Sequence, residues 1–144
     1  MKQHTLHVVT SDEEHGAEMQ RQMRGCVQAF NDSDEKAFGD CLDPKISLFT
    51  PDAHLFGREQ VAGYFRQKYF HQTPAARLEI HESSFHLIGQ TVWYEYEFTI
   101  ESRRGRLHGR GMAMCQETAG RWRMASMHHS LVEFEQGTAR SADR

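Results

Sequence analysis

Two adjacent histidines, His128 and His129, lie in the stretch RMASMHHSLV near the end of the chain. This stretch reads as a β-strand, in which neighbouring side chains point to opposite faces of the sheet. One histidine therefore faces the interior, where an imidazole that titrates near neutral pH is a candidate general acid or base. Ser126 and Ser130 share one row with His128, without the sharp turn that exposes a catalytic serine, so a serine hydrolase is disfavoured.

The turn at 118–120 decides which histidine faces inward. A three-residue loop with Gly120 in the left-handed conformation points His129 inward and His128 outward. A four-residue loop reverses both, and the periodicity of the strand supports either choice. In the first arrangement Tyr96 lies diagonal to His129 and can donate a hydrogen bond to a substrate oxygen. His129 and Tyr96 are therefore the candidate catalytic residues.

Composition argues against several functions. The net charge of -3 and the pI near 6.3 give no bulk attraction to nucleic acid or to an acidic membrane. No stretch approaches the ~18 apolar residues of a membrane span. Ten histidines occur without an HxH or HExxH spacing, so neither a metal site nor a cofactor is expected.

The cysteines and the N-terminus bear on the compartment. The three cysteines, Cys26, Cys41 and Cys115, are odd in number and have no CxxC spacing. They are predicted to be reduced, buried thiols. The first residues lack the apolar core of a signal peptide, so a cytoplasmic location is expected.

Hydrophobic periodicity predicts three helices followed by a sheet. Ser11 and Glu14 form a capping box at the start of the first helix, and the segment 31–34 ends it and caps a second. The expected helices are 11–30, a short one after 34, and one from 57 to about 72. The expected strands are 46–49, 77–82, 85–88, 92–101, 106–117 and 121–134. Residues 11–135 form one domain, 1–10 a lead-in segment and 136–144 a flexible tail. The fold class is α+β, with three N-terminal helices packed on the concave face of a curved antiparallel sheet.

The turn at 102–105 sets the register of the two longest strands. It places Tyr96 opposite Gly111 and Phe98 opposite Gly109, and aromatic rings lying across glycines are typical of strongly curved sheets. The opposite face mixes large apolar groups with charges, which suits a subunit interface. The predicted interface residues are Trp93, Glu95, Glu97, Arg110, Met112, Met114, Trp122, Met124 and His128.

Three stretches carry a family resemblance: DPKISLFTPDA, HLIG (86–89), and GRW followed by HHS. Over residues 13–134 the chain resembles the nuclear transport factor 2-like superfamily, the cone-shaped fold of SnoaL-like cyclases and ketosteroid isomerase. It is most similar to the association (hub) domain of calcium/calmodulin-dependent protein kinase II and its bacterial relatives. The resemblance implies that His129 replaces a pocket arginine, and that two further pocket arginines fall near Phe98 and at Ala113. The isomerase base falls near Thr50 and its oxyanion tyrosine near Cys26, and neither replacement can do the same work.

Two functions remain open. The first is a self-associating domain, a homodimer or higher oligomer, that binds an unknown small molecule in a largely apolar and aromatic central pocket. The second is a cofactor-independent lyase, isomerase or cyclase of SnoaL-like type that uses His129 as general acid or base. The predicted pocket residues are Cys26, Phe30, Phe49, Val61, Tyr64, Phe65, Tyr69, Tyr96, Phe98, Ala113, Met127 and His129.

Overall fold

The computed structural model describes residues 13–136, without the side chains of residues 13–15 and 82. The predicted lead-in segment, the capping box at Ser11 and Glu14, and residues 137–144 of the predicted tail lie outside that description. The elements, in chain order, are α1 (Glu13–Asn31), α2 (Glu35–Asp40), β1 (Leu42–Thr50), β2 (Ala53–Phe56), α3 (Arg58–Tyr69), β3 (Arg77–Ile88), β4 (Thr91–Ser102), β5 (Gly105–Thr118) and β6 (Arg121–Gln136).

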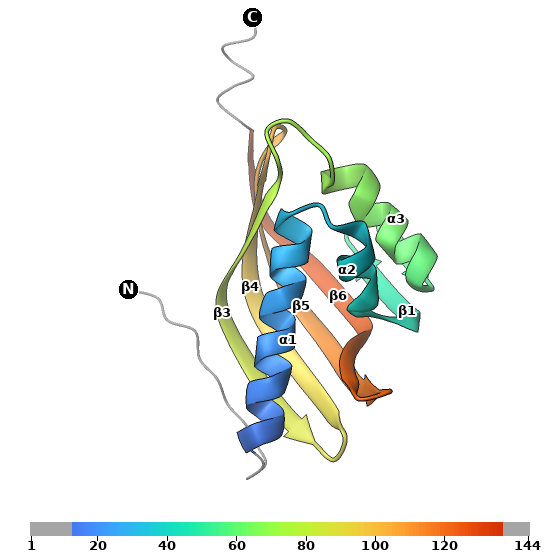
Figure 1. The fold of residues 1–144 in the computed structure, drawn as a ribbon. Helices are drawn as coiled ribbons and strands as arrows, with labels where there is room; N and C mark the ends of the chain where they lie inside the picture. The colour runs from blue at the N-terminus through green and yellow to red at the C-terminus, as the bar shows by residue number, and fades with distance from the viewer. Residues whose placement is uncertain (1–12, 137–144) are drawn as a thin grey trace, which may run out of the picture.

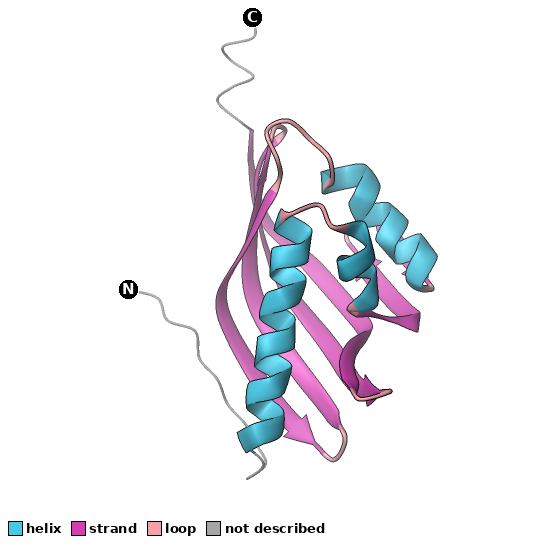
Figure 2. Ribbon diagram, viewed as in Figure 1, coloured by secondary structure: helices cyan, strands magenta, loops and turns pink. Residues whose placement is uncertain are grey.

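All three helices cover one face of a curved, open sheet (Figures 1 and 2). This face is called the inner face below, and the opposite one the outer face. The strand order is β2-β1-β6-β5-β4-β3. The sheet is antiparallel except between β1 and β6, which run parallel. These two strands are joined by a long connection that includes β2, α3 and the strands β3 to β5. The three helices were predicted near their observed places, whereas the short strand β2 was not predicted.

The apolar stripe of α1 and the aromatic residues of α2 and α3 form the core over the inner face. Met19, Met23 and Phe30 of α1 are buried. Asp34 caps α2, its side chain accepting a hydrogen bond from the backbone N–H of Ala37 at 3.1 Å, as the polar segment 31–34 predicts. The rings of Phe30, Phe38 and Phe65 meet edge to face, so the three helices are packed against one another.

The register of the β4–β5 hairpin agrees with the sequence prediction. Tyr96 pairs with Gly111 and Phe98 with Gly109. A Cβ atom at position 111 would lie 2.3 Å from the Tyr96 ring, and one at position 109 would lie 2.6 Å from the Phe98 ring. These two glycines therefore leave the space in which the aromatic rings lie against the sheet.

The β5–β6 hairpin differs from its prediction in two ways. The connection is a two-residue turn at Ala119-Gly120, with Thr118 paired to Arg121, so the three-residue loop was wrong. A β-bulge at Ala125 then inserts one unpaired residue and reverses the alternation of β6. Ahead of the bulge Trp122 and Met124 point inward, and beyond it His129 does.

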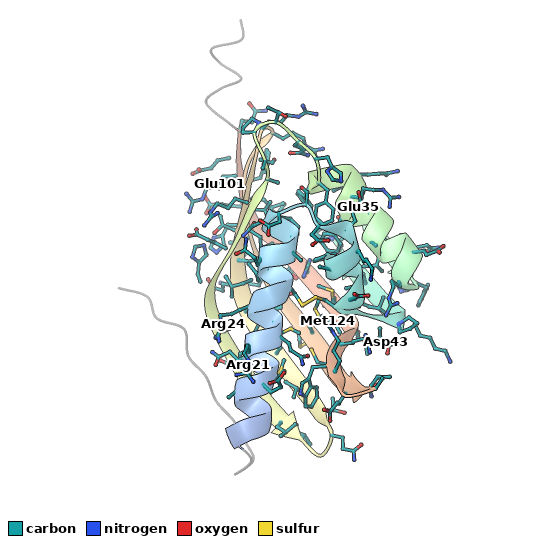
Figure 3. All side chains as sticks on the ribbon, viewed as in Figure 1. Arg21, Arg24, Glu35, Asp43, Glu101 and Met124 are labelled. Carbon is teal, nitrogen blue, oxygen red and sulfur yellow. A yellow bond between two sulfur atoms is a disulfide. The ribbon has the colours of Figure 1, made fainter. Side chains whose placement is uncertain are left out.

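Trp122 and Met124 are consequently core residues, and their assignment to the outer interface was wrong. Trp122 is 3% exposed and Met124 is 6% exposed. The backbone N–H of Trp122 donates to Oε1 of Gln22 on α1 at 2.8 Å. Met124 lies between α1 and α2 on the helix-covered side of the sheet (Figure 3).

The strand β3 is continuous, although two separate strands were predicted in this region. A bulge at His81 accommodates the irregularity in the sequence pattern. At the start of β3, Asn31 of α1 donates to the carbonyl of Leu78 at 3.1 Å and accepts from its N–H at 2.6 Å. The last residue of α1 is thereby fixed to the outermost strand.

Two of the three cysteines do not fit the predicted reduced thiols. Cys26 of α1 and Cys41, which follows α2, form a disulfide, with Cα atoms 6.1 Å apart. Helix packing brings together two residues that the spacing in sequence did not connect. Cys115 is a buried free thiol, as predicted, and burial raises its pKa to about 12. The disulfide removes the argument from cysteine usage for a cytoplasmic location.

Candidate functional site

A cavity of about 60 Å³ lies between the helices and the inner face of the sheet. Strand β4 lines it with alternate residues, among them Tyr96 and Phe98, because every second side chain of a strand faces the same way. His129 and Met127 line it from β6, and the helices close it. Its walls are almost entirely hydrocarbon, thioether and aromatic surface.

His129 and Tyr96 form the polar feature of this cavity. The Tyr96 hydroxyl lies 2.7 Å from Nε2 of His129, a hydrogen bond between two strands separated by β5. Aromatic rings surround the imidazole, with the Phe98 centroid at 5.0 Å and the Phe65 centroid at 6.4 Å. Gly111 lies beneath the Tyr96 ring and allows it to reach the histidine.

Burial sets the protonation of this pair. It lowers the pKa of His129 to about 4, with a smaller contribution from the neighbouring His128. It raises the pKa of the Tyr96 hydroxyl well above its ordinary value. At neutral pH the pair is therefore an uncharged imidazole and an uncharged phenol sharing one proton in a hydrogen bond.

A neutral imidazole–phenol pair can exchange hydrogen bonds with a ligand hydroxyl or carbonyl. The phenol can donate to an oxygen, and a neutral imidazole has one donor and one acceptor nitrogen. With a pKa of about 4, His129 holds a proton weakly at neutral pH, whereas an effective general base has a pKa near the working pH. The low pKa of His129 thus favours recognition of a neutral polar group over strong proton abstraction.

Comparison with known proteins places this fold in a family. The model of the SnoaL-like domain matches residues 8–133. The chain belongs to the SnoaL-like domain family. No protein of curated function matches the sequence.

Solved structures share the nuclear transport factor 2-like, cystatin-like fold of this SnoaL-like domain. A nuclear transport factor 2-like protein of unknown function from Pseudomonas putida KT2440 superimposes with a TM-score of 0.73 at 14% identity, covering 83% of this chain and 87% of the other. A candidate scytalone dehydratase from Novosphingobium aromaticivorans gives 0.75 at 9% identity, covering 88% and 89%. A candidate dehydratase of the same fold family from Streptomyces avermitilis gives 0.72 at 15% identity, covering 85% and 99%. At these identities the likeness concerns the fold alone.

The SnoaL-like domain brings seven of the predicted pocket residues to the cavity wall. They are Cys26, Phe30, Phe65, Tyr96, Phe98, Met127 and His129. Val61 and Ala113 are fully buried in the surrounding core and do not line the cavity. Tyr69 packs against Phe30 at 5.4 Å, and burial raises its pKa to about 12.

Two further pocket predictions differ from the structure. Phe49 lies on the outer face, 39% exposed, where its ring contacts His54 at 3.7 Å and His128 at 6.0 Å. Its pairing with His128 in the parallel β1–β6 ladder fixes this orientation, so its assignment to the pocket was wrong. Tyr64 donates to Oδ1 of Asp52 at 3.3 Å, away from the cavity lining.

Sequence reasoning missed about half of the lining. The missed residues are Met23, Val27, Phe38, Leu78, Ile80, Tyr94, Ile100 and Met124. The helical spacing of Met23 and Val27 with Cys26, and the alternation of Leu78 with Ile80, carried a usable signal. Met124 was missed because a bulge cannot be read from a regular alternation.

The outer face carries the other predicted interface residues. Glu97 lies 3.7 Å from Nε of Arg110 and 3.5 Å from Nε2 of His108. Met114 is 43% exposed, and Trp93, Glu95 and Met112 share its face. His128 is also exposed on this side, opposite Met112.

Over residues 13–136, no group of three or more His, Cys, Asp or Glu side chains is arranged to hold a metal ion. No helix in the described part of the chain is long and apolar enough to cross a bilayer.

Proposed function

We propose that this SnoaL-like domain binds a small, mostly apolar molecule with one neutral hydrogen-bonding group. The observation that carries the proposal is the His129–Tyr96 hydrogen bond inside an otherwise apolar cavity. A polar pair among hydrocarbon walls orients a ligand, because the Tyr96 hydroxyl oxygen keeps a free lone pair and only a ligand with a polar group gains a hydrogen bond there.

The cavity limits the size of this ligand. Its volume of about 60 Å³ exceeds the ~30 Å³ that one water molecule occupies in the liquid. An apolar cavity that accepts benzene measures about 150 Å³, so a single aromatic ring requires the walls to move outward. Met23, Met124 and Met127 supply that adaptability, because unbranched thioether side chains change shape at low cost.

Catalysis is the second candidate, favoured by the 2.7 Å contact between the tyrosine hydroxyl and the imidazole. A lyase, isomerase or cyclase would use His129 to move a proton and Tyr96 to stabilise an oxygen. The candidate dehydratases among the similar structures support this direction. An enzyme should lose turnover on His129→Ala while keeping its fold, whereas a binding domain should change only in affinity.

Phenol and toluene form a matched pair of probes for the binding proposal. They have similar shapes, and phenol alone offers a hydroxyl group. Calorimetry should show that phenol binds about 2–10-fold more tightly, the value of one net hydrogen bond. His129→Leu should remove this preference, and Met127→Trp, which fills the cavity, should abolish binding of both. Unchanged binding by a folded Met127→Trp variant would disprove the proposal.

We also infer that two copies of the chain associate through the outer face. Phe49 and Phe56 are exposed at one side of this face, and Trp93 and Met114 form a second exposed apolar pair on β4 and β5. Ser126 and His128 of β6 lie between the two groups. Large apolar groups rimmed by polar residues on an exposed face are typical of protein–protein contact sites.

Light scattering after size exclusion tests this association. The unaltered chain should elute as a dimer or larger species at micromolar concentration. Phe49→Glu and Trp93→Glu should each shift it toward the monomer. Phe134→Glu is a matched control, because Phe134 is also exposed but faces the inner side near the end of β6. A monomeric unaltered chain, or equal effects of all three changes, would refute the inference.

A further inference from the structure

A groove of about 350 Å³ runs along the outside of the molecule between α1 and β3. It shares five wall residues with the inner cavity: Met23, Val27, Leu78, Ile80 and Tyr94. Side chains that border a groove on one side and a cavity on the other form a partition one side chain thick. The inner cavity is therefore separated from solvent at this place by a thin apolar wall.

One side chain of this partition, that of Met23, can move more easily than the backbone beside it. Met23 is 4% exposed and unbranched, and a rotation about its side-chain bonds would join the groove to the cavity. At one end of the groove the two hydrogen bonds between Asn31 and Leu78 hold α1 and β3 together. The joined space falls within the range of about 300–1,000 Å³ typical of ligand pockets.

The rim of the groove is positively charged. Arg24 of α1 and Arg77 of β3 line it, together with one carboxylate, Glu79. Figure 3 shows Arg24 on the β3 side of α1. Among the described residues, no carboxylate lies within 4.0 Å of Arg24 or Arg77. Two guanidinium groups that have no ion-pair partner among the described side chains, beside an apolar passage, are complementary to a carboxylate joined to an apolar body.

We propose that the groove between α1 and β3 is the access route to the cavity, and that it selects amphipathic monocarboxylates. The apolar body of the ligand enters the cavity past Met23, and its carboxylate remains at the rim, bound by Arg24 and Arg77. This inference rests on the proposed function, because it uses the same cavity. It adds that the ligand is negatively charged, that the charge lies at one end of an apolar body, and that the apolar end enters the cavity first.

The matched probes are 4-phenylbutyrate and 4-phenyl-1-butanol, which share a phenyl ring and a four-carbon chain and differ in the charged end. Calorimetry should show at least tenfold tighter binding of the carboxylate to the unaltered chain. The R24Q/R77Q variant should lose that difference and keep its affinity for the alcohol. Higher salt should weaken binding of the carboxylate alone.

The control variant R21Q/K36Q removes the same charge from exposed positions outside the groove. Arg21 pairs with Glu18 and Lys36 with Asp40, so this change leaves the rim intact. Equal loss of carboxylate affinity in both double variants would overturn the assignment of the rim. If Met127→Trp abolishes phenol binding while the carboxylate preference is absent from the start, the cavity proposal stands and the access route fails. If Met127→Trp leaves phenol binding intact, the cavity proposal itself fails.

Discussion

Replacing Gly111 by alanine tests the arrangement that builds the site. The added Cβ would lie 2.3 Å from Cε2 and Cζ of Tyr96 and 2.6 Å from its hydroxyl oxygen. Carbon atoms pack at about 3.5–4.0 Å, so the ring must move by more than about 1 Å. Such a movement adds an overpacking penalty of about 1–3 kcal/mol to the loss of the hydrogen bond to His129, worth about 0.5–1.5 kcal/mol.

Gly111→Ala should therefore lower the free energy of unfolding by roughly 2–4 kcal/mol. For a domain of this size the melting temperature should fall by roughly 5–15 °C in a calorimetric scan. Gly25→Ala is the control, since position 25 is exposed in the middle of α1 with no atom within 4 Å of an added Cβ. That change should raise stability slightly, because alanine is the better helix former.

A double variant identifies the origin of the loss. In a Tyr96→Ala background, Gly111→Ala should be nearly neutral, since the ring that it displaces is absent. Full stability of Gly111→Ala, or an undiminished loss in that background, would refute the contact between the ring and the glycine.

Three further predictions concern the disulfide, a helix cap and the buried histidine. Cys26→Ser should lower the free energy of unfolding by about 3 kcal/mol under oxidising conditions, the value expected for closing a 15-residue loop, and should have no effect in reductant. Asp34→Ala should cost about 1 kcal/mol in urea unfolding, and Asp34→Asn should retain most of the stability. Because the pKa of His129 is about 4 when folded and near 6.5 when unfolded, the unfolded chain binds a proton first as pH falls. Stability should therefore drop by about 3 kcal/mol between pH 6.5 and 4 and stay level above that window. His129→Leu should flatten this profile, and an NMR titration placing the His129 pKa above 6 would contradict it.

The fold was predictable because its helices and long strands repeat at regular periods. The β4–β5 register followed from one turn and was confirmed residue by residue, which placed Tyr96 over Gly111 correctly. Features that break a period were not predictable in this way. The bulge at Ala125 is one such break, and the parallel pairing that turns Phe49 outward is a long-range consequence of chain topology.

The inward orientation of His129 was predicted from incorrect premises. The predicted loop was one residue too long and the bulge at Ala125 was not foreseen, and each error shifted the register of β6 by one residue in the same direction. Together they leave the face of His129 unchanged but move its partner on β5 by two positions, to Gly111. Ahead of the bulge only the loop error acts, so Trp122 and Met124 were assigned to the wrong face. The apolar residues did indicate a bulge, since Trp122 and Met124 lie at even positions and Met127 lies at an odd one. A regular strand cannot point all three side chains to the same face.

The hydrogen bonds of Asn31 with Leu78 also bear on how the sheet avoids aggregation. An outermost strand offers unpaired backbone groups on which another chain can add a strand, and β3 is such a strand over 12 residues. The Asn31 amide imitates the next strand at Leu78, and the bulge at His81 interrupts the ladder shortly afterwards. The opposite edge, β2, has only four residues and offers little template. Addition of a further strand is thus hindered at the start of β3 and finds only a short template at β2, which lowers the tendency of the sheet to grow edge to edge.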